Sequence, residues 1–294
     1  MSLSATSNPS GLRTGHATAS GGALFVAAAA LLGLSLAAAI AGLLVDDLYA
    51  GAESTAAMFR GYDLVTVLVV APALGVATLA LHRRSRTPTL AVTSLAAYLL
   101  YTYAYFLFGT GFNDLFLVHV AVFVAAGATL VLGLRAVTET GAAPLLLARP
   151  RARVAAILLG ILTVALAAMW IWVGIDNAVT GAVPAGSALV ETETVVRLGI
   201  ALDLALLVPF YATAVVLLWR GGAWGFLLGV VAVTSGLLHQ VSYLVAMPMQ
   251  VAADVPGAAR SDPAEPVVVV VYLLALALLA RARKAAPRRA DRAG

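Results

Sequence analysis

The chain has 294 residues, of which 62% are hydrophobic and only 11% are charged, and its mean hydropathy is +0.99. Soluble domains carry about 25% charged residues, so this composition excludes a soluble globular enzyme and a disordered chain and indicates an integral membrane protein. Cysteine is absent, which excludes disulfides, cysteine-ligated metals and thiol nucleophiles.

Eight apolar stretches approach the roughly 20 helical residues that a bilayer core requires. In chain order they are 17–45, 64–81, a segment within 87–112, 115–134, 154–175, 198–219, a segment within 221–247, and 267–280. The last is short, but Arg281 and Arg283 can extend it by reaching towards the headgroups. We predict an all-α integral membrane bundle of eight transmembrane helices.

The remaining segments are tails and a linker. Residues 1–20 are rich in Ser, Thr and Gly and are expected to be disordered, whereas 281–294 form a basic tail. That tail either lies against anionic lipid or is a simple stop-transfer flank. A linker at 135–153 separates two four-helix halves, 21–134 and 154–280. The first apolar stretch exceeds the h-region of a signal peptide, about 7–15 residues, so we interpret it as a retained anchor.

The basic residues indicate the orientation. Of the 18 Lys and Arg residues, 15 lie in the two tails and in the connections around 82–87, 135–153 and 220–223, with two acids; the alternate connections carry three basic residues and ten acids. The positive-inside rule therefore places both termini in the cytoplasm of a plasma-membrane protein. Because the basic residues are divided among short connections, we predict no nucleic-acid partner.

Two parts of the chain look alike at a fixed offset. Val92-Thr93-Ser94 recurs as Val233-Thr234-Ser235, and Asp63-Leu64 recurs 140 residues later as Asp203-Leu204. Four helices return a chain to the same side, so the halves would form a parallel repeat of the kind found in secondary transporters. Pro72 and Pro209 do not align at this offset, which counts against matching helix breaks.

Two aspartates lie at or inside predicted spans. Asp203 is about 9 Å beyond Arg197 in the sixth helix, where an ionisable group is costly and marks a functional site or a buried pair. Both roles remain open, with Arg197, a tyrosine or a histidine as possible partners. Asp63 is expected in the first turn of the second helix, where the helix dipole explains a negative charge.

Polar side chains follow one face of the third and seventh helices. With the aspartates they define a candidate polar cavity formed by Asp63, Tyr98, Tyr101, Tyr105, His119, Asp203, His239, Gln240 and Tyr243. Taken singly, the tyrosines are more typical of interhelical hydrogen bonding, whereas His239 with Gln240 beside it fits a structural and a functional role equally. All of these residues except Tyr98 are expected in the outer half of the bilayer. Trp170 and Trp172 are expected to close the outer end of the fifth helix, which predicts a cavity open to the outside.

No cofactor or metal site is predicted. The four histidines lack metal-ligand spacing, and phosphate loops, HExxH and GxSxG motifs are absent. Haem ligation between His119 and His239 is disfavoured because their expected depths differ by several ångströms.

Residues 98–124, with 61–72 and 202–210, resemble a family of uncharacterised bacterial polytopic membrane proteins, most specifically at the FG-x2-FN-x-LFL segment beginning at Phe108. The resemblance covers about half of the chain. It implies a bacterial plasma-membrane protein and brings no catalytic residues with it.

Three functions from different classes remain. The first is a transporter or permease of a small molecule or ion, with its site near Asp203. The second is a structural or accessory subunit whose polar stripes join helices. The third is a membrane-embedded enzyme that acts on a lipid or quinone with Asp203 or His239 as acid or base. The expected partners are the lipid bilayer and a small-molecule or ion ligand, and the oligomeric state is open.

The orientation can be tested with reporter fusions. Fusions after Arg86 and at Gly294 should report the cytoplasm, whereas fusions near Gly51 and Gly186 should report the outside, because the arginine-rich connections stay inside. An outside signal at Gly294 would remove the eighth span and the repeat with it.

Overall fold

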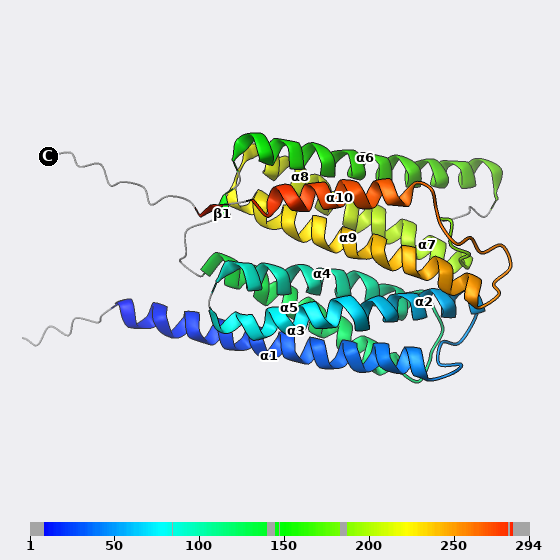
Figure 1. Cartoon of the computed structure of the whole chain (residues 1–294), viewed down its shortest axis with the longest axis horizontal. Helices are drawn as coiled ribbons and strands as arrows, with labels where there is room; N and C mark the ends of the chain where they lie inside the picture. The colour runs from blue at the N-terminus through cyan, green and yellow to red at the C-terminus, as the bar shows by residue number, and fades with distance from the viewer. Residues whose placement is uncertain are drawn as a thin grey trace, which may run out of the picture.

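A computed structural model describes residues 9–83, 85–139, 145–146, 148–182, 187–281 and 283–284. The helices are α1 (Pro9–Leu44), α2 (Glu53–Val65), α3 (Ala71–Ala80), α4 (Arg86–Phe108), α5 (Phe116–Glu139), α6 (Arg149–Thr180), α7 (Glu193–Leu202), α8 (Val208–Arg220), α9 (Ala223–Ala252) and α10 (Glu265–Leu279). Two short strands, β1 (Leu145–Leu146) and β2 (Arg283–Lys284), pair antiparallel at one end of the bundle (Figure 1).

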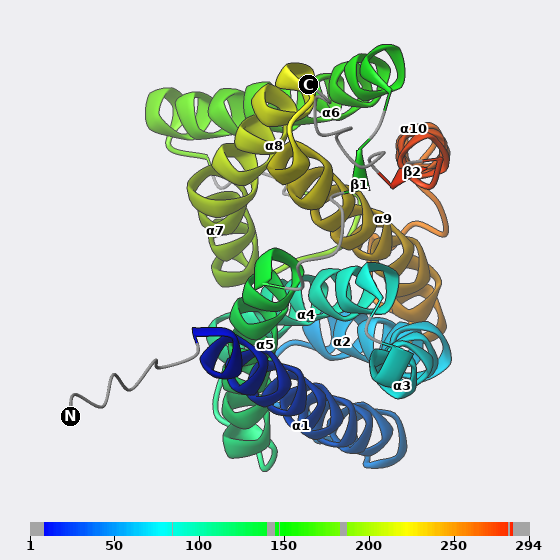
Figure 2. The ribbon, with the colours of Figure 1, turned by 90° about the vertical axis from the view of Figure 1, so that its left-hand side faces the viewer.

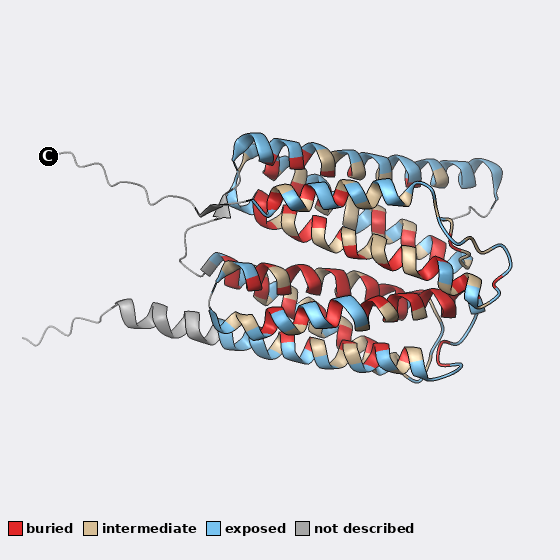
Figure 3. Ribbon diagram, in the orientation of Figure 1, coloured by how far each residue is buried: buried red, intermediate tan, exposed pale blue. Residues whose placement is uncertain are grey.

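In the described part of the chain, seven helical spans are long and apolar enough to cross a membrane. Two of them are composite, since α2 continues into α3 and α7 continues into α8. The shorter α10 lies against α6 and α9. Many large apolar side chains face outwards, and the outer face of α6 is exposed along its length (Figure 3). This is the helix set of a multi-pass membrane bundle, in which lipid covers the apolar exterior.

The helices form two groups, α1–α5 and α6–α10, which Figure 2 shows end-on. In the first group α1 packs on α3 and α5, and α4 packs on the same two helices; in the second, α6 and α9 each pack on α8 and α10. When α2 with α3 and α7 with α8 are each counted as one helix, the four helices of each group contact one another in the same cyclic order.

The two groups contact each other at three helix–helix interfaces, called seams below, which differ in how closely the helices pack. At the first seam α2 packs closely on α9, where a Cβ added at Gly61 would lie 2.6 Å from the Cα of Ala246. Small residues allow this backbone approach, as they do at many membrane helix contacts. A central seam joins α4 to α9 and includes a 2.6 Å hydrogen bond between the hydroxyls of Tyr98 and Ser242. At the third seam α4 and α7 touch at few positions.

Two spans contain a π-helical turn. These turns are η1 (Thr66–Val70) and η3 (Asp203–Leu207), and each is followed by a proline, Pro72 or Pro209. Proline lacks an amide hydrogen and crowds the carbonyl four residues earlier, and a wider turn just before it relieves this conflict. The prolines and their π turns match each other at an offset of 137, so they still do not align at the offset of 140 that relates Asp63 to Asp203.

Several helices extend beyond the apolar stretches. α2 begins at Glu53 where 64 was expected, α7 begins at Glu193 where 198 was expected, and α6 continues to Thr180 beyond 175. α1 begins at Pro9, inside the segment expected to be disordered; residues 1–8 lie outside the described residues. The added turns of α2 are buried against protein, so hydropathy alone does not mark them as membrane-spanning.

The α2–α9 seam gives a stability prediction. Gly61→Ala should destabilise the protein by about 1–3 kcal/mol, the usual effect of overpacking a tight contact. The control is Gly75→Ala in α3, where the new Cβ would be 3.6 Å from Leu32 and helix propensity improves. Thermal unfolding in detergent measures both, and equal melting temperatures would contradict the tight seam.

Candidate functional site

A cavity of about 820 Å³ lies where the two groups of helices are loosely joined. Its walls come from α4, α5, α6, the α7–η3–α8 span, α9 and the start of α10, which surround the centre of the end-on view in Figure 2. Most lining side chains are aliphatic or aromatic. Its volume is within the range of small-molecule sites, about 300–1,000 Å³.

Asp203 lines this cavity and is only 8% exposed. The hydroxyl of Tyr101 donates to its Oδ1, and the indole Nε1 of Trp170 donates to its Oδ2 at 2.7 Å. Both donors are neutral. No Arg or Lys is among the lining residues in the part of the chain that the structure describes, so the protein supplies no cation to balance a charge on this carboxylate.

Aromatic rings surround the carboxylate on the α4 and α9 sides. The hydroxyls of Tyr101 and Tyr105 are 3.2 Å apart, and the ring of His239 meets Tyr101 edge-on with centroids 5.0 Å apart. Gly199 in α7 leaves room for Tyr105, because a Cβ there would lie 2.9 Å from its hydroxyl. A bulky tyrosine thus occupies the α4–α7 seam, whereas small residues fill the α2–α9 seam.

Acidic side chains lie at one end of the cavity. Glu191 comes from the loop before α7, and Asp262 and Glu265 come from the segment that leads into α10. Burial raises the pKa of Glu191; a hydrogen bond from Ser187 opposes this shift, and the charge of Asp203 adds to it. A buried acid with a raised pKa is stabilised in its charged form by a nearby cation.

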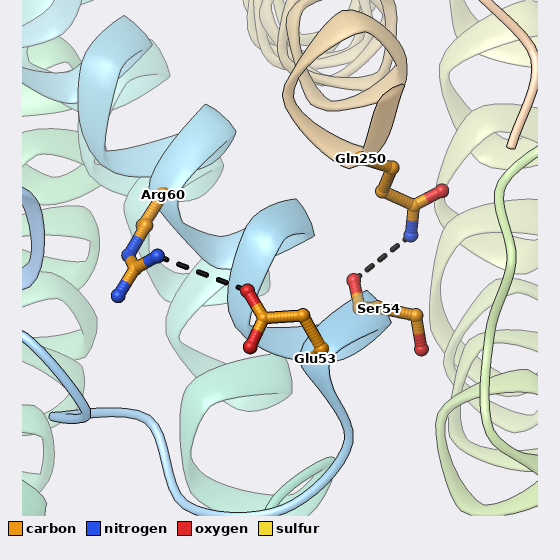
Figure 4. A network of polar contacts seen from close by, with 4 residues as sticks. All are labelled: Glu53, Ser54, Arg60 and Gln250. Atoms are coloured by element: carbon orange, nitrogen blue, oxygen red, sulfur yellow. Dashed lines mark hydrogen bonds and ion pairs between the residues drawn. The ribbon is translucent and has the colours of Figure 1, made fainter. Parts of the chain in front are cut away.

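The loop that carries Glu191 is held by two side chains of α9. The Tyr243 hydroxyl accepts the amide hydrogen of Ala188 at 2.9 Å and donates to Asp262 at 3.3 Å. Gln250 accepts from the Val190 amide and donates to the carbonyls of Val190 and Ser54. Figure 4 shows Gln250 bridging to α2. The loop of Glu191 and the side chain of Asp262 are therefore held against α9.

The ion pair near this bridge is a weaker contact. Arg60 lies 3.9 Å from Glu53 (Figure 4), with side chains 28% and 61% exposed. A pair at this distance and exposure adds little stability.

The structure brings together seven of the nine predicted site residues. Those that line the cavity are Tyr98, Tyr101, Tyr105, Asp203, His239, Gln240 and Tyr243. The other two, Asp63 and His119, lie in the first group of helices and do not line it. The candidate site is therefore smaller than predicted and belongs to the junction between the groups.

The predicted position of Asp63, in the first turn of the second helix, is wrong. Asp63 lies ten residues after the start of α2, is 2% exposed, and accepts a 2.5 Å hydrogen bond from the hydroxyl of Tyr49, so the dipole of a first turn does not explain it. Burial raises the pKa of Tyr49 and Asp63 raises it further, which keeps the hydroxyl protonated as a donor. Gly42 provides the space, since a Cβ there would lie 2.9 Å from Cγ of Asp63.

His119 packs among the rings of Tyr49, Tyr103 and Phe106. Neither of its ring nitrogens has a hydrogen-bond partner among the described residues. Because His119 belongs to this cluster and His239 lines the cavity, the two do not form a common haem site. The described residues also hold no group of three or more metal-ligating side chains.

Trp170 is a partner of Asp203 that the sequence did not indicate. It was expected to close the outer end of the fifth helix, but α6 continues to Thr180 and places Trp170 inside at 7% exposure, while Trp172 is 69% exposed. Of the partner types expected for Asp203, namely Arg197, a tyrosine or a histidine, a tyrosine, Tyr101, bonds to it. The loop acids were interpreted only as topology signals, and their positions around one cavity are visible only in three dimensions.

No protein-family model matches the chain, and no curated protein or solved structure matches it either. The long apolar helices indicate a multi-pass membrane protein, and the bundle they form contains a cavity.

The Trp170–Asp203 contact can be tested by removing its donor. Trp170→Phe should lower stability by about 1–2 kcal/mol, because it removes a buried hydrogen bond to a carboxylate within a membrane bundle. Trp172→Phe, two residues away and exposed, should leave the melting temperature unchanged. An equal loss of stability in both variants would show that the hydrogen bond from the Trp170 indole does not contribute to stability.

Proposed function

We propose that the protein is a transporter or permease of a small molecule, with the cavity around Asp203 as its substrate site. The observation that carries the proposal is a buried carboxylate that faces a cavity between two groups of helices and has only neutral partners. Ionisable groups at membrane depth are costly and are retained mainly where they serve a substrate or ion pathway.

We also propose that the two groups are a parallel internal repeat, for which similarities between them give support. Both groups have the same order of neighbouring helices, and each has one span interrupted by a π turn before a proline. Asp63 lies ten residues after Glu53, and Asp203 lies ten residues after Glu193. Transporters built from such repeats bind substrate at the repeat interface, which is where this cavity lies.

The unequal seams suggest how access would alternate. At offsets of 140 and 141, the counterparts of Gly61 and Ala246 are Ala201 and Tyr105. The small pair closes the α2–α9 seam, and the larger pair marks the open α4–α7 seam. In the proposed cycle one seam closes while the other opens.

The charge distribution supports an orientation. The arginine-bearing connections gather at the end of the bundle where the described chain begins and ends, and the acidic connections gather at the other (Figure 1). The positive-inside rule then places both termini in the cytoplasm and the acidic end of the cavity outside the plasma membrane. In this arrangement α10 is the eighth span; its 15 residues cover about 22 Å, so the bilayer would thin beside it.

A second candidate is an enzyme that acts on a lipid or quinone. Leu206 lines the cavity and is 58% exposed, which favours entry from the bilayer. An enzyme would convert its substrate, whereas a transporter releases it unchanged, so chemical analysis of the recovered compound separates the two.

Transport can be measured in proteoliposomes with a panel of labelled organic cations, neutral amphiphiles and inorganic ions. At least one compound should cross faster than in protein-free vesicles, and Asp203→Asn should abolish the difference, because the isostere loses the charge. Asp63→Asn is the matched control, since Asp63 is also buried and lies ten residues after the start of its helix; it should keep transport while lowering stability.

Two results would contradict the proposal. One is that folded protein moves no compound of the panel, and the other is that Asp203→Asn transports at the wild-type rate. If Asp203→Asn melts at a much lower temperature and the wild type transports nothing, the role of Asp203 is structural, as in an accessory subunit.

A further inference from the structure

The charged side chains around the cavity all have the same sign. Asp203 lies along its wall, and Glu191, Asp262 and Glu265 lie towards one end. Lys and Arg are missing from the lining within the described ranges. A low-dielectric cleft with charges of one sign concentrates ligands of the opposite sign, so these acids favour a cation over an anion.

The remaining wall determines which kind of cation fits. An inorganic cation requires several oxygen ligands at short distance, and the described residues contain no cluster of metal-ligating side chains. Most of the wall is hydrocarbon or aromatic, with Tyr101, Tyr105 and His239 close to the carboxylate. Aromatic faces attract organic cations and add about 0.5–2 kcal/mol per desolvated contact.

Asp203 retains acceptor capacity for such a ligand. Each of its oxygens receives one neutral donor, from Tyr101 or Trp170, whereas a carboxylate offers about four lone-pair sites. A cation beside the two oxygens would therefore balance the charge without displacing either donor. The two donors would fix the carboxylate in position, which reduces the ordering required on binding.

We propose that the cavity binds a lipophilic organic cation, a mainly apolar molecule with one quaternary or delocalised positive charge beside Asp203. This proposal rests on the transport function proposed above and specifies its substrate class. The cavity of about 820 Å³ accommodates a drug-sized ligand. Leu206 lines the cavity and is 58% exposed, which favours a ligand that has already dissolved in the bilayer.

Two probes of nearly equal shape and opposite charge test the proposal. Radiolabelled tetraphenylphosphonium and tetraphenylborate are dialysed against purified full-length protein in detergent, with protein-free detergent as the blank. The phosphonium should bind saturably and the borate should not. Asp203→Asn should weaken phosphonium binding about thirtyfold or more, as expected when one partner of a desolvated charge pair is removed. Asp63→Asn should leave the affinity unchanged.

The absence of cysteine provides a second, site-specific measurement. Ser235 lines the cavity, whereas its counterpart at offset 141, Ser94, is fully buried and does not line it. A maleimide should label Ser235→Cys and not Ser94→Cys. Tetraphenylphosphonium should slow the labelling of Ser235→Cys, and tetraphenylborate should not. Glu191→Gln, at the acidic end, gives a second charge variant if Asp203→Asn fails to fold.

The outcomes separate the two proposals. The proposal that the cavity selects cations is wrong if both probes bind equally. It is also wrong if neither Asp203→Asn nor Glu191→Gln weakens phosphonium binding. If the phosphonium neither binds nor protects Ser235→Cys, the cation proposal is also wrong. Transport of a neutral compound or inorganic ion that depends on Asp203 would still support the transport function in that case.

Discussion

The close contact between α2 and α9 sets the geometry of the whole bundle. Gly61 lets the backbones approach until Ala246 lies where a side chain would otherwise be. Lipid tails are as apolar as the helix surfaces, so helices associate in a membrane through packing and hydrogen bonds more than through hydrophobic burial. A close backbone approach at one seam therefore fixes the angle at which the two groups meet, and the opposite seam remains wider.

The two buried aspartates show how similar chain segments reach different chemical situations. Asp63 has its partner, Tyr49, inside the first group, next to Gly42 and the rings around His119. Asp203 has its partners on α4 and α6, with the cavity beside it. Both carboxylates are buried, so the cavity next to Asp203 makes the difference.

The sequence predicted the long apolar helices well, because the bilayer imposes a minimum length that hydropathy measures directly. It failed at helix ends, as at Glu53, where polar turns are covered by protein and carry no hydropathy signal. Most of the candidate site was also predicted, since helical spacing placed Tyr98, Tyr101 and Tyr105 on one face. Trp170 was missed because α6 had to be extended before its side chain could reach Asp203.

The position of the π turn relative to each aspartate has a mechanical consequence. In the first group Asp63 lies three residues before η1, inside regular helix. In the second group Asp203 is itself the first residue of η3, and its carbonyl accepts the amide hydrogen of Val208, just before Pro209. A π turn lies close in energy to alternative local arrangements and often serves as an adjustable point in a helix. A change in the bend at Pro209 therefore moves Asp203 directly, whereas a change at Pro72 leaves Asp63 in place. Asp203, the carboxylate beside the cavity, is therefore coupled in position to the bend of its own helix, whereas Asp63 is not.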